Sequence, residues 1–335
     1  MIKIDTIDKI TLKTREQFLS EHILFEKPVI ITGIANHWRA IQHWTADYLS
    51  QTIGQVDVTY RLSASYLHPD LNQLNPSSFY TPHAKKISNE MANLNYFHSS
   101  KLHEFICLIT DKQLQGTAFL CGEGLSIYNH NKFNDKIKAI LPDFDLPFLF
   151  DEKNLIKAGL WVSPKKIVSW LHYDGNGLHN LNAQVRGQKK VRLFSPQETW
   201  RYYIYLYSKS PYFNFSQINI LNPNLSKFPH FENACYYEGI LEEGDLLYIP
   251  AYWLHTFEHL DDININLNFW WKENLKIANP LLIRSNFFSL LKTLLTRQDK
   301  TDLSLPINAL LKKYPPAFKK HILDIETAML ETSES

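Results

Sequence analysis

Hydrophobic and polar positions in the first sixty residues change from a helical to an alternating pattern. Residues 14–24 place Phe18, Leu19 and Ile23 at helical spacing and predict a helix. After Lys27 and Pro28, the β-branched run at residues 29–32 predicts a strand that ends at Gly33. Thr45 is a suitable N-cap for a short helix over residues 46–50, and residues 56–60 alternate like a strand.

Beyond residue 160 the pattern becomes a succession of short strands separated by turn residues. Glycine-containing turns are expected at residues 174–177, 186–188 and 243–245. The predicted strands are Leu160–Ser163, Ile167–Asp174, Leu181–Arg186, Lys189–Phe194, Leu246–Pro250, Leu254–His259 and Ile263–Trp270. Many short strands with turns between them predict a mainly β fold, and a double-sheet jelly roll can hold a small-molecule site inside.

Two stretches depart from this strand pattern. Residues 63–100 are rich in Asn, Ser, Pro and His, and their weak periodicity predicts a long surface excursion. Residues 194–245 are rich in aromatic side chains, and we expect them to form an insertion between two barrel strands.

The last part of the chain returns to helical spacing. Apolar residues recur with amphipathic periodicity over residues 287–295 and 318–329, so we expect helices that either pack on the barrel or form a homodimer. The chain therefore divides into a main domain at residues 1–278 and a helical region at residues 279–335. Within the first part, residues 1–159 are the N-terminal helices and strands and residues 160–272 are the core barrel.

Composition narrows the class of protein. The chain has 335 residues, with 35 Lys and Arg against 34 Asp and Glu, and its net charge of +1 makes a nucleic-acid partner improbable. Without a signal-like N-terminus or an apolar run of membrane-spanning length, we expect a soluble, cytoplasmic protein. The three cysteines share no CxxC spacing, so we expect buried thiols rather than disulfides or a zinc site.

Spacing reduces the 14 histidines to a few candidate metal ligands. His172 and Asp174 would lie on one face of an extended segment, because alternate side chains of a strand share a face. His255 ends an apolar segment that begins at the Gly244 turn, and it is the best third ligand. Two imidazoles and one carboxylate suit non-haem Fe(II) oxygen chemistry. His179 and His259 are expected to be core or surface residues instead.

Three asparagines share one face of the last predicted strand. Asn264, Asn266 and Asn268 alternate with apolar residues between positions 263 and 269. Buried amides require hydrogen-bond partners, so this face must meet either solvent or a polar site.

Several motifs together resemble those of a known enzyme family. They are the HxD…H pattern, the segment Gly244–His255, the stretch from Ser216 to Phe231 with its two Xaa-Pro motifs, and the opening Lys27–Gly33 with Trp38 and Trp44. Over about residues 20–275 the chain resembles the Jumonji-C, cupin-like dioxygenases. The resemblance is greatest to the branch that contains the asparaginyl hydroxylase that inhibits the hypoxia-inducible factor.

The resemblance implies a double-stranded β-helix that uses Fe(II), 2-oxoglutarate and O2 and releases succinate and CO2. It assigns the distal carboxylate of 2-oxoglutarate to Lys189, and strand alternation agrees, because Lys189 shares a face with apolar Val191 and Leu193. Ser169 would bind the same cosubstrate only if a bulge interrupts its strand. Asn180, Asn268 and Tyr128 match further cosubstrate-side positions.

The expected activity is hydroxylation of a side chain in a protein or peptide. A tRNA-base hydroxylase, a lysine demethylase, and a non-catalytic cupin-like module that binds a metal or ligand are the alternatives. A cupin-type isomerase or metal-dependent hydrolase is a further one. Residues 175–179 make the loop after Asp174 about two residues longer than in the asparaginyl hydroxylase, so the substrate identity does not follow from the resemblance.

Overall fold

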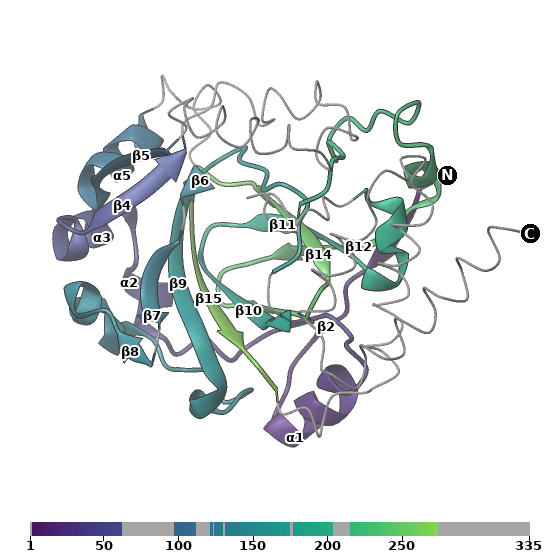
Figure 1. The fold of residues 1–335 in the computed structure, drawn as a ribbon. Helices are drawn as coiled ribbons and strands as arrows, with labels where there is room; N and C mark the ends of the chain where they lie inside the picture. The colour runs from purple at the N-terminus through teal and green to yellow at the C-terminus, as the bar shows by residue number, and fades with distance from the viewer. Residues whose placement is uncertain are drawn as a thin grey trace, which may run out of the picture.

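Two facing β-sheets form the centre of the protein, as the computed structural model shows (Figure 1). The structure describes residues 2–61, 97–111, 121–122, 124–129, 131–174, 177–203 and 215–273. Side chains from the two sheets pack against each other, with Val191 and Leu193 from one sheet meeting Leu247 and Ile249 from the other. The fold is therefore the jelly-roll sandwich that the strand pattern predicts.

The larger sheet has eight strands in the order β2-β3-β13-β10-β15-β9-β7-β8, and only the β2–β3 pair is parallel. Its strands are β2 (Lys9–Ile10), β3 (Val29–Ile31), β7 (Leu125–Asn129), β8 (Lys132–Phe133), β9 (Leu155–Pro164), β10 (His179–Arg186), β13 (Leu246–Ile249) and β15 (Ile263–Trp271). The longest pairings join β15 to β9 and to β10, which places these three strands in the middle of the sheet.

The smaller sheet has four strands in the order β1-β12-β11-β14, and only β1 and β12 run parallel. Its strands are β1 (Lys3–Thr6), β11 (Lys189–Phe194), β12 (Cys235–Leu241) and β14 (Leu254–His259). Because β12 is a full member of this sheet, residues 194–245 are not only an insertion, and that prediction was wrong for 235–241. Local composition hid this strand, because its glutamate, glycine and tyrosines do not alternate strictly with apolar residues.

The segment from residue 166 to residue 174 follows the free edge of β14 without forming the continuous strand that we expected. Isolated bridges join Val168 to Glu258 and His172 to His255, so the segment contains one more residue than β14 between these two pairs. An extra residue on one side is the definition of a bulge. Ser169 lies in it, and its backbone N–H donates to the carbonyl of Phe257 at 2.7 Å.

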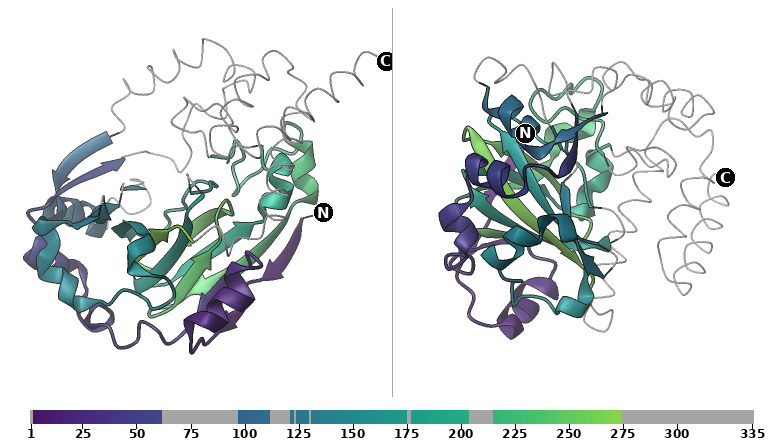
Figure 2. Two further views of the ribbon diagram at one scale, coloured as in Figure 1. Left: turned by 60° about the horizontal axis from the view of Figure 1, so that its bottom comes forward. Right: turned by 90° about the vertical axis from the view of Figure 1, so that its left-hand side faces the viewer.

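The N-terminal elements cover the outer face of the eight-stranded sheet (Figure 2). They include α1 (Arg15–Phe18), α2 (Arg39–His43), α3 (Ala46–Ile53), α5 (Leu102–Thr110) and the small sheet of β4 (Asp57–Arg61), β5 (Phe97–Lys101) and β6 (Cys121–Gly122). The predicted cap is confirmed, because Thr45 Oγ1 accepts the Tyr48 N–H at 3.1 Å. Trp38 and Trp44 pack here with Phe269, so the alternate residues of β15 must face the other sheet.

Further expectations concerned two stretches of the chain, the cysteines and membrane-spanning segments. Residues 279–335 and most of 63–100 lie outside the described residues, although residues 97–100 belong to β5. Cys107 is exposed and Cys235 is half-buried, so the expectation of buried thiols was wrong for both. Among the described helices, none has the length and apolarity that crossing a membrane requires.

Candidate active site

His172 and His255 lie side by side at the edge of the smaller sheet. Their backbones exchange two hydrogen bonds, of 3.2 and 2.7 Å, and their ring centroids are 4.4 Å apart. Asp174 follows two residues after His172. One donor atom from each of the three side chains lies within 4.8 Å of the other two, as the spacing predicts.

Both imidazoles are held by the same local contact. Nδ1 of His172 lies 2.7 Å from the carbonyl oxygen of Trp170, and Nδ1 of His255 lies 3.1 Å from that of Trp253. A carbonyl oxygen can only accept, so Nδ1 carries the proton in each ring and donates it. Each Nε2 is left with its lone pair, which is the form that binds a metal.

The Asp174 carboxylate is held by one of its two oxygens. Oδ2 accepts hydrogen bonds from Asn180 Nδ2 at 2.8 Å and from Trp270 Nε1 at 2.9 Å. Oδ1 lies 4.0 Å from His255 Nε2. Burial acts to raise the pKa of Asp174, but the neighbouring histidines and the two N–H donors outweigh it and keep that pKa below its ordinary value.

Two imidazole nitrogens and one carboxylate oxygen therefore converge within 4.8 Å of one another. This donor set fits Fe(II) in the two-histidine, one-carboxylate arrangement, which leaves coordination positions open on the opposite side. The fixed tautomers and the engaged Oδ2 support the fit, because they are the outer hydrogen bonds that orient ligands in metal sites.

Lys189 points from β11 into the space between the sheets, as its alternation predicts. Its side chain is 1% exposed, and Nζ donates to Asn182 Oδ1 at 2.6 Å and lies 4.6 Å from the centre of the Phe257 ring. Burial lowers the pKa of Lys189 well below its ordinary value. Among the described residues no carboxylate pairs with it, whereas the outward-facing Arg192 pairs with Glu238 and Glu258.

The Asn row of β15 faces this same interior. Asn264, Asn266 and Asn268 are at most 5% exposed, so of the two environments that the sequence allowed, the polar site is observed. Asn268 Nδ2 donates to Asn180 Oδ1 at 3.0 Å, and Asn180 in turn contacts Asp174. Asn180 therefore contacts the candidate ligand Asp174 directly, and Asn268 reaches it through Asn180.

Ser169 and Tyr128 are placed differently. Ser169 lies in the bulge that its predicted role requires, half-buried, and its Oγ accepts the backbone N–H of Phe257 at 2.8 Å. Tyr128 is on β7, with β9 between it and β15. Its hydroxyl lies 3.5 Å from Asn131 Oδ1, and its ring packs on Phe133. The recorded contacts of Tyr128 do not reach the triad.

The two other candidate histidines are buried outside the metal-ligand group. His179 Nδ1 lies 3.0 Å from the hydroxyl of Tyr248, and burial lowers the pKa of His179 to about 4. His259 stands opposite Lys189 in the β11–β14 pairing, and its Nδ1 has no hydrogen-bond partner among the described residues. Burial, together with the lysine, lowers the pKa of His259 to about 3.

Comparison with known proteins identifies the family. Residues 15–277 match the model of the cupin-like domain, which covers well over half of the chain. The chain belongs to the cupin-like domain family.

The relatives of this cupin-like protein include one that is named for the JmjC domain. Lysine-specific demethylase 8 of Xenopus tropicalis is 27% identical over 269 residues, which are 79% of this chain and 52% of that protein. JmjC domain-containing protein D of Dictyostelium discoideum is 29% identical over 73% of this chain and 51% of its own length. Human tRNA wybutosine-synthesizing protein 5 is 28% identical over 77% of this chain and 75% of its own length.

The chain spans about half the length of the first two of these relatives. The Jumonji-C class that the motifs resemble is thereby supported, and its members are typically Fe(II)- and 2-oxoglutarate-dependent oxygenases. The narrower resemblance to the asparaginyl hydroxylase stays a prediction.

Three residues of the cupin-like site were not singled out from the sequence. Trp270 continues the alternation of the Asn row by one step, and Asn182 lies two residues after Asn180 on β10, so simple strand periodicity could have found both. Phe215 stacks on His172 with ring centroids 5.1 Å apart. It comes from a distant segment, and no local pattern indicates this contact.

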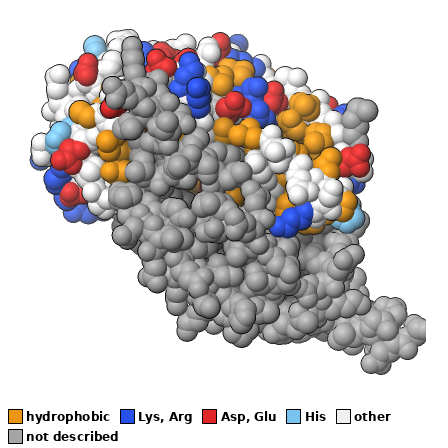
Figure 3. All heavy atoms as spheres, turned by 90° about the horizontal axis from the view of Figure 1, so that it is seen from above, with side chains coloured by type: hydrophobic (Ala, Val, Ile, Leu, Met, Phe, Trp, Pro, Cys, Tyr) orange, Lys and Arg blue, Asp and Glu red, His pale blue; other side chains and the backbone are white. Residues whose placement is uncertain are grey.

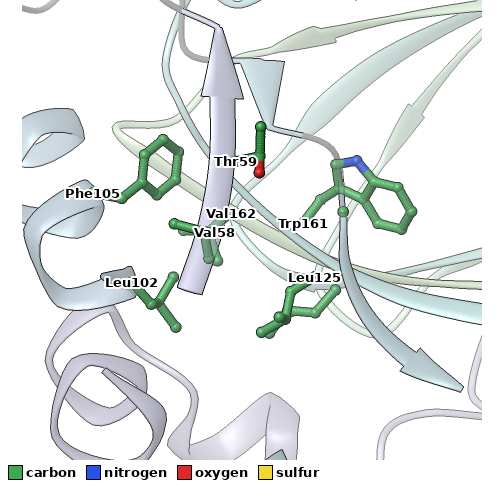
Figure 4. A pocket seen from close by; sticks show the side chains of 9 residues that line it. Val58, Thr59, Leu102, Phe105, Leu125, Trp161 and Val162 are labelled. Atoms are coloured by element: carbon green, nitrogen blue, oxygen red, sulfur yellow. The ribbon is translucent and has the colours of Figure 1, made fainter. Parts of the chain in front are cut away.

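A pocket lies between β4 and β9 (Figure 4). It encloses roughly 330 Å³, including space that is open to solvent, and its lining is mainly apolar, with Leu102, Phe105 and Trp161 among the contributors. The Trp161 ring lies 5.3 Å from that of Trp270, which donates to Asp174. The lining of this pocket does not include His172, Asp174 or His255, so the pocket is distinct from the candidate metal centre.

Proposed function

We propose that this cupin-like protein is an Fe(II)- and 2-oxoglutarate-dependent oxygenase that hydroxylates a side chain of a protein substrate. The family match and the relatives of the Jumonji-C class support the oxygenase part of the proposal. The donor set formed by His172, Asp174 and His255 supports iron as its metal.

The observation that carries the proposal is the buried, uncompensated Lys189. A buried ammonium requires an anionic partner, and no described carboxylate supplies one. Its Nζ lies over the Phe257 ring, and that ring is 5.6 Å from the ring of the metal ligand His255. A dicarboxylate that reaches the metal with one end could therefore offer its other end to Lys189.

Each residue of the candidate site would have a separate role. The Nε2 atoms of His172 and His255 and Oδ1 of Asp174 would hold the metal from one side. Lys189 would bind the distal carboxylate of 2-oxoglutarate, and burial of that contact would strengthen it because little water competes there. Iron and 2-oxoglutarate, once bound, supply the oxidising chemistry, with O2 consumed and succinate and CO2 released.

The charge distribution favours a protein substrate over RNA. The net charge is +1, and on the described surface seen in Figure 3 acidic and basic side chains are interspersed. RNA binding normally relies on a concentrated basic surface. A tRNA base is the second candidate, because the alignment with human tRNA wybutosine-synthesizing protein 5 covers 75% of that relative.

The test is succinate formation from 2-oxoglutarate with Fe(II) and ascorbate. The wild type should form succinate, and His172→Ala should abolish it. His37→Ala is the matched control, since that histidine is 65% exposed and should leave turnover unchanged. Absence of turnover in the wild type, with peptide and tRNA pools supplied, would reject the oxygenase assignment.

Substrate class is read in the same reactions by mass spectrometry. A gain of one oxygen atom in a peptide supports the protein substrate, and the same gain in a tRNA nucleoside supports the second candidate. Loss of a methyl group from lysine with release of formaldehyde would instead indicate a demethylase.

A further inference from the structure

Three buried asparagines connect Lys189 to Asp174 in an unbroken series of hydrogen bonds, which we call the amide chain. Lys189 Nζ donates to Asn182 Oδ1 at 2.6 Å, and Asn182 Nδ2 donates to Asn268 Oδ1 at 3.0 Å. Asn268 Nδ2 donates to Asn180 Oδ1 at 3.0 Å, and Asn180 Nδ2 donates to Asp174 Oδ2 at 2.8 Å. The asparagines of the amide chain are 2 to 5% exposed.

Strand pairing places the amide chain on the inner face of the larger sheet. Asn182 pairs with Leu247 on β13 and with Asn268 on β15, and Leu247 packs against the smaller sheet. Asn180 is two residues away on β10 and shares that face. Lys189 comes from the opposite sheet, so its bond to Asn182 crosses the sandwich.

The two ends of the amide chain determine the orientation of every amide in it. An ammonium can only donate and a carboxylate can only accept, so each asparagine must direct its oxygen toward Lys189 and its NH2 toward Asp174. Reversing one amide would set donor against donor on one side and acceptor against acceptor on the other. Since these groups are buried, each such mismatch is unfavourable.

Asn182 is therefore a neutral acceptor that holds Nζ of Lys189 at one point without neutralising its charge. The Phe257 ring, whose centre lies 4.6 Å from Nζ, is also uncharged. A carboxylate in the place of Asn182 would form an ion pair with the Lys189 ammonium. The ammonium would then bind a ligand anion more weakly. An apolar residue there would leave the four-carbon stem of the lysine free to change rotamer.

We infer that Asn182 is a positioning residue that orients Lys189 for the distal carboxylate and thereby sets the chain length of the 2-oxo dicarboxylate that the site accepts. This inference rests on the proposed function. Asn268 and Asn180 also have a role, because they fix the orientation of the Asn182 amide relative to the metal ligand Asp174.

The test measures binding rather than turnover, by titration calorimetry of the full chain loaded with Mn(II). The ligands are 2-oxoglutarate, its one-carbon-shorter analogue oxaloacetate and its one-carbon-longer analogue 2-oxoadipate. Asn182→Leu should weaken 2-oxoglutarate binding by about tenfold or more, the usual effect of removing a hydrogen bond to a charged group. Asn182→Leu should also reduce the ratio between the affinity for 2-oxoglutarate and the affinities for the two analogues.

Asn182→Asp is the second variant and keeps the size of the side chain. It should weaken binding of all three dicarboxylates more than Asn182→Leu does, because the new carboxylate competes for Lys189. Asn266→Leu is the matched control. Asn266 also donates to Asn268 Oδ1, but its recorded bonds do not include one to Lys189, so the length preference should stay as in the wild type.

The outcomes separate the two proposals. If the wild type with Mn(II) fails to bind 2-oxoglutarate, the proposed function fails and this inference fails with it. If the wild type binds but the Asn182 variants keep its affinity and length preference, only the inference is overturned. Equal losses in Asn182→Leu and Asn266→Leu would also overturn it, because they would indicate general loosening of the interior.

Discussion

Lys189 and Asn182 form a pair whose coupling can be measured as folding stability. In Lys189→Met the buried Asn182 Oδ1 loses its donor, which costs about 1–3 kcal/mol, although burying methionine in place of an amine offsets part of this. In Asn182→Leu the buried Lys189 Nζ loses Asn182 Oδ1 as its acceptor, which costs about 1–3 kcal/mol.

The double variant removes both polar partners and leaves apolar side chains of similar size. Replacing both members of a buried pair is often nearly neutral, so we expect it to be at least as stable as either single variant. Asn268 Oδ1 keeps its bond from Asn266 in all three proteins. The coupling energy between the two positions should therefore be about 1–3 kcal/mol.

The assay is urea unfolding of the metal-free protein, followed by circular dichroism, with the free energy of unfolding extrapolated to water. Single-variant losses that add in the double variant to within about 0.5 kcal/mol would refute the reasoning, because independent sites behave in that way. The same three variants should all bind 2-oxoglutarate more weakly than the wild type. If the double variant regains stability but does not bind 2-oxoglutarate, the buried amine of Lys189 serves ligand binding and not the stability of the fold.

Three further predictions concern pH, metal binding and ligand orientation. Burial lowers the pKa values of His179 and His259 to about 4 and about 3, so between those values and about 6.5 the unfolded chain binds more protons than the folded one. The free energy of unfolding should therefore fall on acidification through this pH range, by about 1.4 kcal/mol per pH unit for each histidine. His259→Gln should reduce this dependence on pH, as measured by urea unfolding at several pH values. Mn(II) at a hundred times its dissociation constant should stabilise the wild type by about 2.7 kcal/mol, and an equal gain in His255→Ala would contradict the assigned ligands. Trp270→Phe removes one donor to Asp174 Oδ2 and should weaken Mn(II) binding about 10- to 100-fold in calorimetry, whereas unchanged affinity would show that the indole does not orient the carboxylate.

Local sequence determined most of the core strands beyond residue 160 and the group of side chains that could hold a metal ion. Strand alternation is set by backbone geometry alone, so it correctly grouped Lys189 with Val191 and Leu193 and the three asparagines of β15 with one another. The HxD spacing together with the histidine that ends the Gly244–His255 segment was enough to select the three side chains that converge.

The tertiary structure decided what alternation leaves open, namely which face is inside and which side chains meet across it. The outer face of β15 is covered by Trp38, Trp44 and their neighbours, and only that packing turns the asparagines inward. The bulge at Ser169 and the membership of β12 in the smaller sheet likewise depend on pairing between distant segments. The amide chain is the clearest case, because a hydrogen bond between residues 86 positions apart, Asn182 and Asn268, exists only once two strands are paired in register.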